Sequence, residues 1–103
     1  MSTRSEIRFN FRQALAQADE LDGVAERLER LSGKTMESSM QTLASAWKGQ
    51  NATAFLRKED ILKGDVKKTA MEIHDIADDI RRIARRIYNA EMAALQIASR
   101  RES

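Results

Sequence analysis

The chain has 103 residues and carries 18 Lys and Arg against 16 Asp and Glu, for a formal net charge of +2. It contains no proline, no cysteine and four glycines, so residues that form tight turns are scarce. A β-sandwich or barrel needs a turn roughly every 8–12 residues, and this composition therefore excludes those folds. The absence of cysteine excludes disulfides and thiolate metal sites. A single histidine, His74, excludes a zinc site built from histidines of one chain, and it excludes a Ser–His–Asp triad.

The first half of the sequence predicts one long helix over about residues 4–47. Thr3 and Glu6 have the spacing of a capping box at the start of a helix. Apolar or small residues then recur in alternating steps of four and three, at positions 7, 11, 14, 18, 21, 25 and 28. A second apolar stripe follows at positions 28, 31, 36, 40, 43 and 47. This spacing is typical of coiled coils and helical hairpins, and the broad stripe indicates a helix that is covered on two sides.

The second half predicts another helix, over about residues 52–99. Steps of four and three run without a break from Leu62 to Ile97, which is about five heptads. Beside this seam, three alanines recur every seven residues, and such a row favours the close approach of another helix. They are Ala70, Ala77 and Ala84. We predict that the seam of the hairpin and of a dimer is formed by Phe11, Ala18, Leu21, Leu28, Leu43, Leu62, Val66, Ile73, Ile76, Ile80, Ile83 and Ile87.

Gly49 is the glycine with the best context for a break between the helices. It follows the first apolar seam, and Asn51 can cap a second helix that starts at Ala52. The sequence thus predicts a single domain over residues 1–103, with two antiparallel helices, each roughly 60–70 Å long, joined by a turn at about 48–51. Two helices cannot cover both flanks of a broad apolar stripe. We therefore expect this all-α helical hairpin to dimerise into an elongated four-helix bundle.

Trp47, Lys48 and Gly49 place a Trp-x-Gly tripeptide at this turn. With its length, its two amphipathic helices and a late tyrosine, the sequence resembles the WXG family, the small early-secreted-antigen-like proteins of bacterial type VII secretion. The resemblance covers almost the whole chain. It implies a helical hairpin that is exported as a folded dimer, or that acts as the co-secreted partner or chaperone of a larger effector. It also implies a bipartite export signal, in which the Trp-x-Gly end of one subunit lies near the C-terminal end of its partner's second helix.

The second half of that signal in the family is Tyr-x-x-x-Asp/Glu. Here Tyr88 is followed by Glu91 at the third position and by Met92 at the fourth. On a helix, both spacings put the acid on the face of the tyrosine. Either Glu91 replaces the usual acid, or the chain travels with a partner that carries the signal. We predict a recognition site formed by Trp47, Gly49, Tyr88 and Glu91, and ordinary structural roles for these residues are the alternative.

The resemblance also implies partners and a location. The partner is a second copy, another small helical protein, or the helical N-terminal region of a larger effector, and the secretion ATPase recognises the assembly. An adaptor that stays inside the cell and keeps a toxin soluble is a further alternative. Residues 1–10 lack the apolar region of a secretory signal peptide, and no apolar run approaches the roughly 18–20 residues of a membrane span. We expect the protein to be in the bacterial cytoplasm before export and in the secreted or cell-surface fraction afterwards, without stable membrane insertion.

Four arginines form the main alternative binding surface: Arg81, Arg82, Arg85 and Arg86. Asp78 has the spacing for ion pairs with the first two, so a solvated helix face is the simplest interpretation. The alternative is an electrostatic docking surface for an acidic partner or a phosphate backbone, which would make the chain a basic nucleic-acid-binding or regulatory protein. Aromatic interleaving and a base-reading motif are both missing, so we do not expect nucleic acid.

Neither the histidine nor any sequence motif indicates catalysis. We expect His74 to face solvent or to be partly packed. The Glu-x-x-His pattern of di-iron bundles has a spacing of three, whereas Glu72 and His74 are two apart, so we predict no metal site. Phosphate-binding loops and nucleophile motifs are absent, and a slender hairpin offers little concavity for a pocket. The sequence therefore predicts no enzymatic activity, no catalytic residue and no cofactor.

Overall fold

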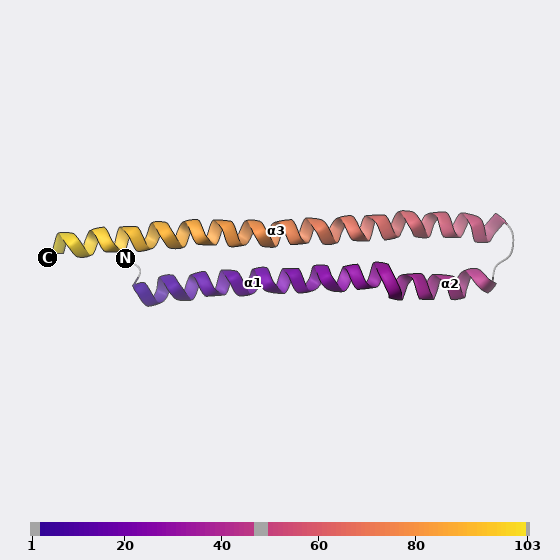
Figure 1. Ribbon diagram of the computed structural model, residues 1–103, viewed down its shortest axis with the longest axis horizontal. Coiled ribbons are helices and arrows are strands. Elements are labelled where there is room, and N and C mark those ends of the chain that lie inside the picture. Colours follow the sequence, from indigo (N-terminus) through magenta and orange to yellow (C-terminus); the bar gives the residue numbers. More distant parts are fainter. Residues whose placement is uncertain (1–2, 47–49, 103) are drawn as a thin grey trace. The chain divides into compact units, whose positions relative to one another are not determined.

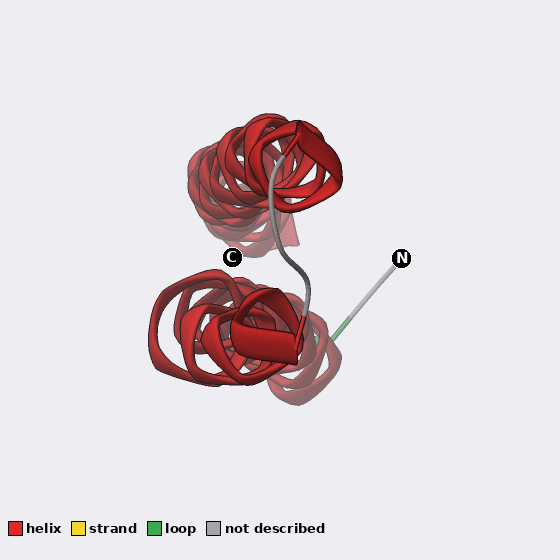
Figure 2. Cartoon of the chain, turned by 90° about the vertical axis from the view of Figure 1, so that its right-hand side faces the viewer, coloured by secondary structure: helices red, strands yellow, loops and turns green. Residues whose placement is uncertain are grey.

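The computed structural model describes residues 3–46 and 50–102, and nearly all of these residues are helical (Figure 1; Figure 2). Helix α1 spans Arg4–Arg30, the π-helical segment η1 spans Leu31–Thr35, α2 spans Met36–Ala46 and α3 spans Gln50–Glu102. The predicted all-α class is therefore confirmed. Helix α3 begins two residues before the expected start, so Asn51 lies inside the helix. The sequence had suggested Asn51 as the N-cap, and this suggestion was wrong.

The start of α1 is capped by Thr3. The Thr3 hydroxyl oxygen accepts the backbone N–H of Glu6 at 3.2 Å, and the hydroxyl donates to the Glu6 carboxylate at 3.1 Å. The first backbone bond of the helix follows, from Ile7 N–H to the Thr3 carbonyl at 3.0 Å. A side-chain acceptor at this position satisfies one of the backbone donors that a helix start leaves unpaired. The N-cap that was predicted from the sequence is thus confirmed.

The π-helical segment has an explanation in the spacing of the inward-facing residues. Ala18, Ala25 and Ser32 are buried at intervals of seven, and the next half-buried apolar residues are Met36 and Met40. The steps from 32 to 36 and from 36 to 40 are both four, whereas an α-helix has 3.6 residues per turn. A π turn closes i→i+5 hydrogen bonds and takes in an extra residue. The segment Leu31–Thr35 therefore accommodates steps of four residues, which are longer than one α-helical turn, and keeps the two methionines half-buried.

The contacts of the chain divide into two compact units. The first consists of Met1–Leu21 with Asp75–Ser103, and the second is Asp22–His74. In both units, residue numbers along the first helical stretch rise as those along α3 fall. Contacts that show this are Phe11 with Tyr88 and Asp19 with Arg81 in the first unit, and Asp22 with His74 and Glu37 with Lys63 in the second. Each unit is therefore built from antiparallel helical segments, as in a helical hairpin. The assignment of residues 1–103 to a single domain stays a prediction.

Small side chains fill the interior of these helix pairs. The alanine row on α3 is buried, with exposed fractions of 0% for Ala70 and Ala77 and 8% for Ala84. On α1, Ala18 and Ala25 are also fully buried. Helices that meet through alanines approach closely, but each alanine buries little apolar area, so each contributes little hydrophobic stabilisation. The prediction that the alanine row allows close helix packing is confirmed.

The larger residues of the predicted seam do not share this burial. Ala18 is buried, whereas Phe11, Leu21, Leu28, Val66, Ile73 and Ile80 are half-buried. Five others are exposed by about half, namely Leu43 (50%), Leu62 (45%), Ile76 (51%), Ile83 (53%) and Ile87 (53%). The described helix pairs bury the alanines more completely than these five residues, which the sequence assigned to a seam shared by the hairpin and a dimer. Their proposed role in a dimer is a separate matter and stays a prediction.

Among the described residues, no helix combines the length and the apolar composition that are needed to cross a membrane.

Candidate functional site

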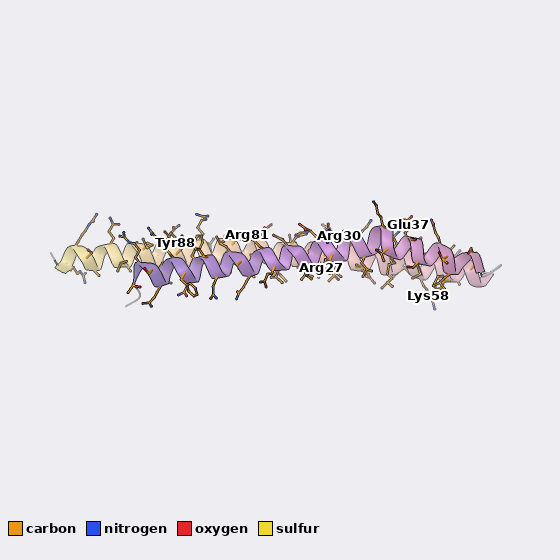
Figure 3. The ribbon with its side chains drawn as sticks, turned by 90° about the horizontal axis from the view of Figure 1, so that it is seen from below. Arg27, Arg30, Glu37, Lys58, Arg81 and Tyr88 are labelled. Carbon is orange, nitrogen blue, oxygen red and sulfur yellow. The ribbon has the colours of Figure 1, made fainter. Side chains whose placement is uncertain are left out.

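Tyr88, the late tyrosine of the sequence, lies on α3 (Figure 3). Within the first unit its ring stacks on Phe11 of α1. The two ring centroids are 4.7 Å apart, and the ring planes differ by 28°. The guanidinium carbon of Arg85 lies 5.5 Å from the centroid of the Phe11 ring. Aromatic stacking contributes about 0.5–1.5 kcal/mol beyond burial, and an exposed cation–π contact contributes about 0.5–1 kcal/mol. These contacts hold the Tyr88 ring against α1.

Tyr88 and Glu91 line the same hollow, which has a volume of about 230 Å³. Its other lining residues come from α1 and α3 and are mostly apolar: Ile7, Asn10, Phe11, Ala14, Ala84 and Ile87. Among these lining residues Glu91 carries the one charge, and its side chain is half-buried. A spacing of three residues places Tyr88 and Glu91 on one helix face. The structure thus brings together the two residues of the predicted recognition site that lie on α3.

The other two residues of the predicted recognition site, Trp47 and Gly49, lie outside the described residues, as does part of the predicted turn at 48–51.

The arginine face is engaged in local pairs. Arg81 donates to Asp78 at 3.0 Å and to Asp19 of α1 at 2.8 Å, and Arg82 donates to Asp79. The predicted pairing of Asp78 with Arg81 is confirmed. Pairs as exposed as these contribute about 0–1 kcal/mol each. Because carboxylates offset two of the four arginines, these contacts favour a solvated, ion-paired helix face and give the nucleic-acid alternative no support.

A second polar cluster surrounds His74 within the second unit. The Nδ1 atom of His74 lies 2.6 Å from Asp22 Oδ1, and its Nε2 atom lies 2.9 Å from Glu29 Oε1. A neutral imidazole has one N–H, so it can donate to one carboxylate only, whereas the imidazolium donates to both. The hydrogen bond to Asp22 raises the pKa of His74 above its usual value of 6.5, partial burial opposes this shift, and Glu29 adds to it.

The sequence-based expectation was that His74 faces solvent or is partly packed, and its side chain is partly packed, with 34% exposed. Among the described residues, no group of three or more His, Asp or Glu side chains is arranged to hold a metal ion. Sequence reasoning considered the neighbours of His74 on its own helix and missed its partners on α1. The signal that could have revealed them is the spacing of Asp22 and Glu29, which are seven residues apart and share one face of α1.

A wider hollow of about 600 Å³ lies along the end of α1 and the π-helical segment. It is lined by Glu26, Glu29, Arg30, Gly33, Lys34 and Thr35, and Figure 3 labels Arg30 among them. The lining residues all belong to one continuous stretch of the chain, and they include no histidine or cysteine.

Comparison with family models gives a match to WXG100, which is described as proteins of 100 residues with WXG, over residues 6–92. Comparisons with curated proteins and with solved structures return no match. The matched range contains the Trp-x-Gly tripeptide as well as Tyr88 and Glu91. WXG100 proteins are small secreted helical proteins that are known to form dimers. Because the match spans most of the sequence and agrees with the all-helical structure, the chain belongs to the WXG100 family of type VII secretion proteins.

Proposed function

We propose that this chain is a non-enzymatic substrate of type VII secretion, exported as a folded dimer or together with a larger effector for which it acts as partner or chaperone. The observation that carries this proposal is the common hollow of Tyr88 and Glu91 in a member of a secreted family. Because Glu91 lies beside Tyr88 in that hollow, it takes the place of the acid that the family has one position later. Trp47 and Gly49 supply the other half of the signal.

The exposed isoleucines supply the proposed partner surface. Ile76, Ile83 and Ile87 are each exposed by more than half, and Leu62 continues the same row. Large apolar side chains that recur along one side of a helix are typical of protein–protein interfaces. Their burial in a partner explains why the chain has a row of isoleucines that its own helix pairs leave in solvent. The partner is a second copy of the chain, another small helical protein, or the helical N-terminal region of an effector.

The proposed route starts in the bacterial cytoplasm, where the assembly forms, and ends in the secreted or cell-surface fraction. The secretion ATPase is the proposed receptor of the signal. None of these steps needs a cofactor or a catalytic group of the chain.

An export assay with matched variants tests this function. Wild type, Tyr88→Ala and Glu91→Gln are expressed in a host with a type VII system, and the fraction of each protein in the medium is measured. Loss of a central recognition contact lowers affinity by about tenfold or more, so we expect Tyr88→Ala to lower export by a similar factor. Asn89→Ala is the control, because Asn89 is an exposed neighbour on the same helix. Equal export of wild type, Tyr88→Ala and Glu91→Gln would overturn the proposal.

A further inference from the structure

We infer that the export signal of this chain is a composite surface, in which Phe11 on α1 positions Tyr88 on α3 and their hollow receives an apolar side chain that the secretion machinery presents beside a basic group. This inference rests on the proposed function and extends it in two ways. It adds a residue from the opposite end of the sequence to the signal, and it states the chemistry of the surface that recognises it.

The first step of the argument is that Tyr88 lies inside a helix. Helix α3 runs without interruption from Gln50 to Glu102, so the tyrosine and Glu91 are presented on a regular helical surface. An extended peptide would expose both residues in any folded or unfolded context, whereas a helical surface exposes one face only. The face that carries Tyr88 and Glu91 is the face that meets α1. A receptor that binds Tyr88 and Glu91 in the folded chain therefore also contacts α1.

The second step is the contact that fixes the tyrosine. The Phe11 ring stacks on Tyr88 at 4.7 Å and also contacts Arg85, whose guanidinium carbon lies 5.5 Å from the ring centroid. The Phe11 ring therefore restrains the tyrosine ring from one side. Restraint before binding reduces the side-chain entropy that is lost when the complex forms. Phe11 is therefore a positioning residue, which acts on recognition through the orientation of Tyr88.

The third step is the chemistry of the hollow. Its volume of about 230 Å³ is below the range of about 300–1,000 Å³ that is typical of small-molecule sites, so it suits one side chain of a protein partner. Its walls are mostly apolar, and Glu91 gives it a single negative charge. Within the described residues, the Glu91 carboxylate makes no hydrogen bond or ion pair, and it can pair with a cation of the partner. An apolar side chain flanked by Lys or Arg complements this lining in shape and charge.

The test uses substitutions of Phe11 with matched controls in the export assay. Phe11→Ala removes the stack, and we expect it to lower the exported fraction by about tenfold, as Tyr88→Ala does. Phe11→Tyr keeps an aromatic ring and should retain export within about twofold of wild type. Phe11→Leu keeps apolar volume without stacking, so its exported fraction should be as low as that of Phe11→Ala. Phe9→Ala is the control on the same helix, because Phe9 is 60% exposed and does not line the hollow.

Two further measurements separate positioning from other effects. If Phe11 acts through Tyr88, the double variant Phe11→Ala/Tyr88→Ala is no worse than Tyr88→Ala alone, because the two residues share one interaction. Glu91→Lys should lower export more than Glu91→Gln, since it places a like charge against the basic group of the receptor. Circular dichroism of each variant reports whether the helices remain formed.

The outcomes are distinct for the inference and for the proposed function. Tyr88-dependent export with wild-type export of Phe11→Ala and Phe11→Leu overturns the composite signal and leaves the proposed function standing. Additive losses in the double variant also overturn it. If Glu91→Lys is exported to the same extent as Glu91→Gln, the receptor does not present a basic group to Glu91, and that part of the inference is overturned. If wild type itself is not exported by the secretion system, the proposed function fails. If Phe11→Ala loses its helical signal, the export of Phe11→Leu is compared with that of Phe11→Tyr. Equal export of these two variants would then overturn the composite signal.

Discussion

His74 Nδ1 lies 2.6 Å from Asp22 Oδ1, and this contact joins α3 to α1 across 52 positions of sequence. On the other side of the ring, Nε2 lies 2.9 Å from Glu29 Oε1. Both contacts are hydrogen bonds only while the imidazole is protonated, since a neutral ring would turn a lone pair toward one of the carboxylates. The three residues therefore form a clasp within the second unit that depends on the charge of His74.

The clasp predicts a pH-dependent contribution of His74 to stability. Asp22, with Glu29, raises the pKa of His74 in the folded chain above the value near 6.5 of an unfolded chain. The stabilisation is therefore complete below about pH 6.5 and is lost as the pH rises through the raised folded value. Urea denaturation of wild type and His74→Ala should show their largest difference in stability at about pH 6, and a smaller one at about pH 9.

A titration of the histidine by NMR provides the control for this clasp. Asp22→Asn removes the carboxylate whose hydrogen bond contributes most to the shift, and Glu29→Gln removes the other carboxylate that raises it, so each should move the His74 pKa down toward its usual value. A stability difference between wild type and His74→Ala that does not change with pH would contradict the clasp.

The buried alanine row predicts low tolerance for larger side chains. Ala77 is 0% exposed and lies in the middle of the row on α3. Extra methylene groups in such a position force side chains and backbone apart, so Ala77→Leu should lower the free energy of unfolding by about 1–3 kcal/mol. Urea denaturation measures the change, and Ala93→Leu is the matched control, because Ala93 is exposed on the same helix. Equal stability of the two variants would mean that the alanines do not close the helix pair.

The exposed isoleucine row predicts a separate effect on assembly. Ile83 is 53% exposed, so Ile83→Lys should leave the helical signal of the chain intact while lowering its association with a partner. Sedimentation of the purified chain, alone and with candidate partners, measures the mass of the assembly. Met71→Lys is the control, since Met71 is 65% exposed and lies outside the predicted seam on α3. If Met71→Lys disrupts the assembly and Ile83→Lys leaves it intact, the partner surface is misplaced.

Gly64 tests the continuity of α3. It lies within the helix, and beyond its chain neighbours and the adjoining helix backbone a Cβ added at this position would meet no atom within 4 Å. Glycine in a helix interior is about 0.8–1.0 kcal/mol less favourable than alanine, so Gly64→Ala should stabilise the chain by up to this amount. Thermal unfolding monitored by circular dichroism measures the change. A loss of stability on Gly64→Ala would contradict a continuous helix through this position.

Some features were predictable from the sequence because they depend on local periodicity. The cap at Thr3, the helical course of both halves and the close packing of Ala70, Ala77 and Ala84 follow from spacing within one helix. The π-helical segment Leu31–Thr35 was not predicted, although the two steps of four after Ser32 carry its signal. The periodicity of apolar residues by itself predicts α-helical stripes and does not specify the type of helix.

The candidate site was predictable in part for a related reason. Tyr88 and Glu91 share one helix, so their common face follows from their spacing. The contacts of Phe11 with Tyr88 and of Asp22 with His74 depend on the register of one helix against the other, which no spacing within either helix determines. Phe11 was predicted to be a seam residue, and its half-burial and its stack on the tyrosine are the basis of the positioning role that we propose for it.

The most direct test of the central claim is the ratio of exported to cellular protein for wild type and Tyr88→Ala, in hosts with and without the secretion ATPase. The account predicts that wild type reaches the medium only where the ATPase is present, and that Tyr88→Ala stays in the cell in both hosts. Helix content of the purified variant, measured by circular dichroism, should equal that of wild type. Export of wild type in the absence of the ATPase, or undiminished export of Tyr88→Ala in its presence, would contradict the account.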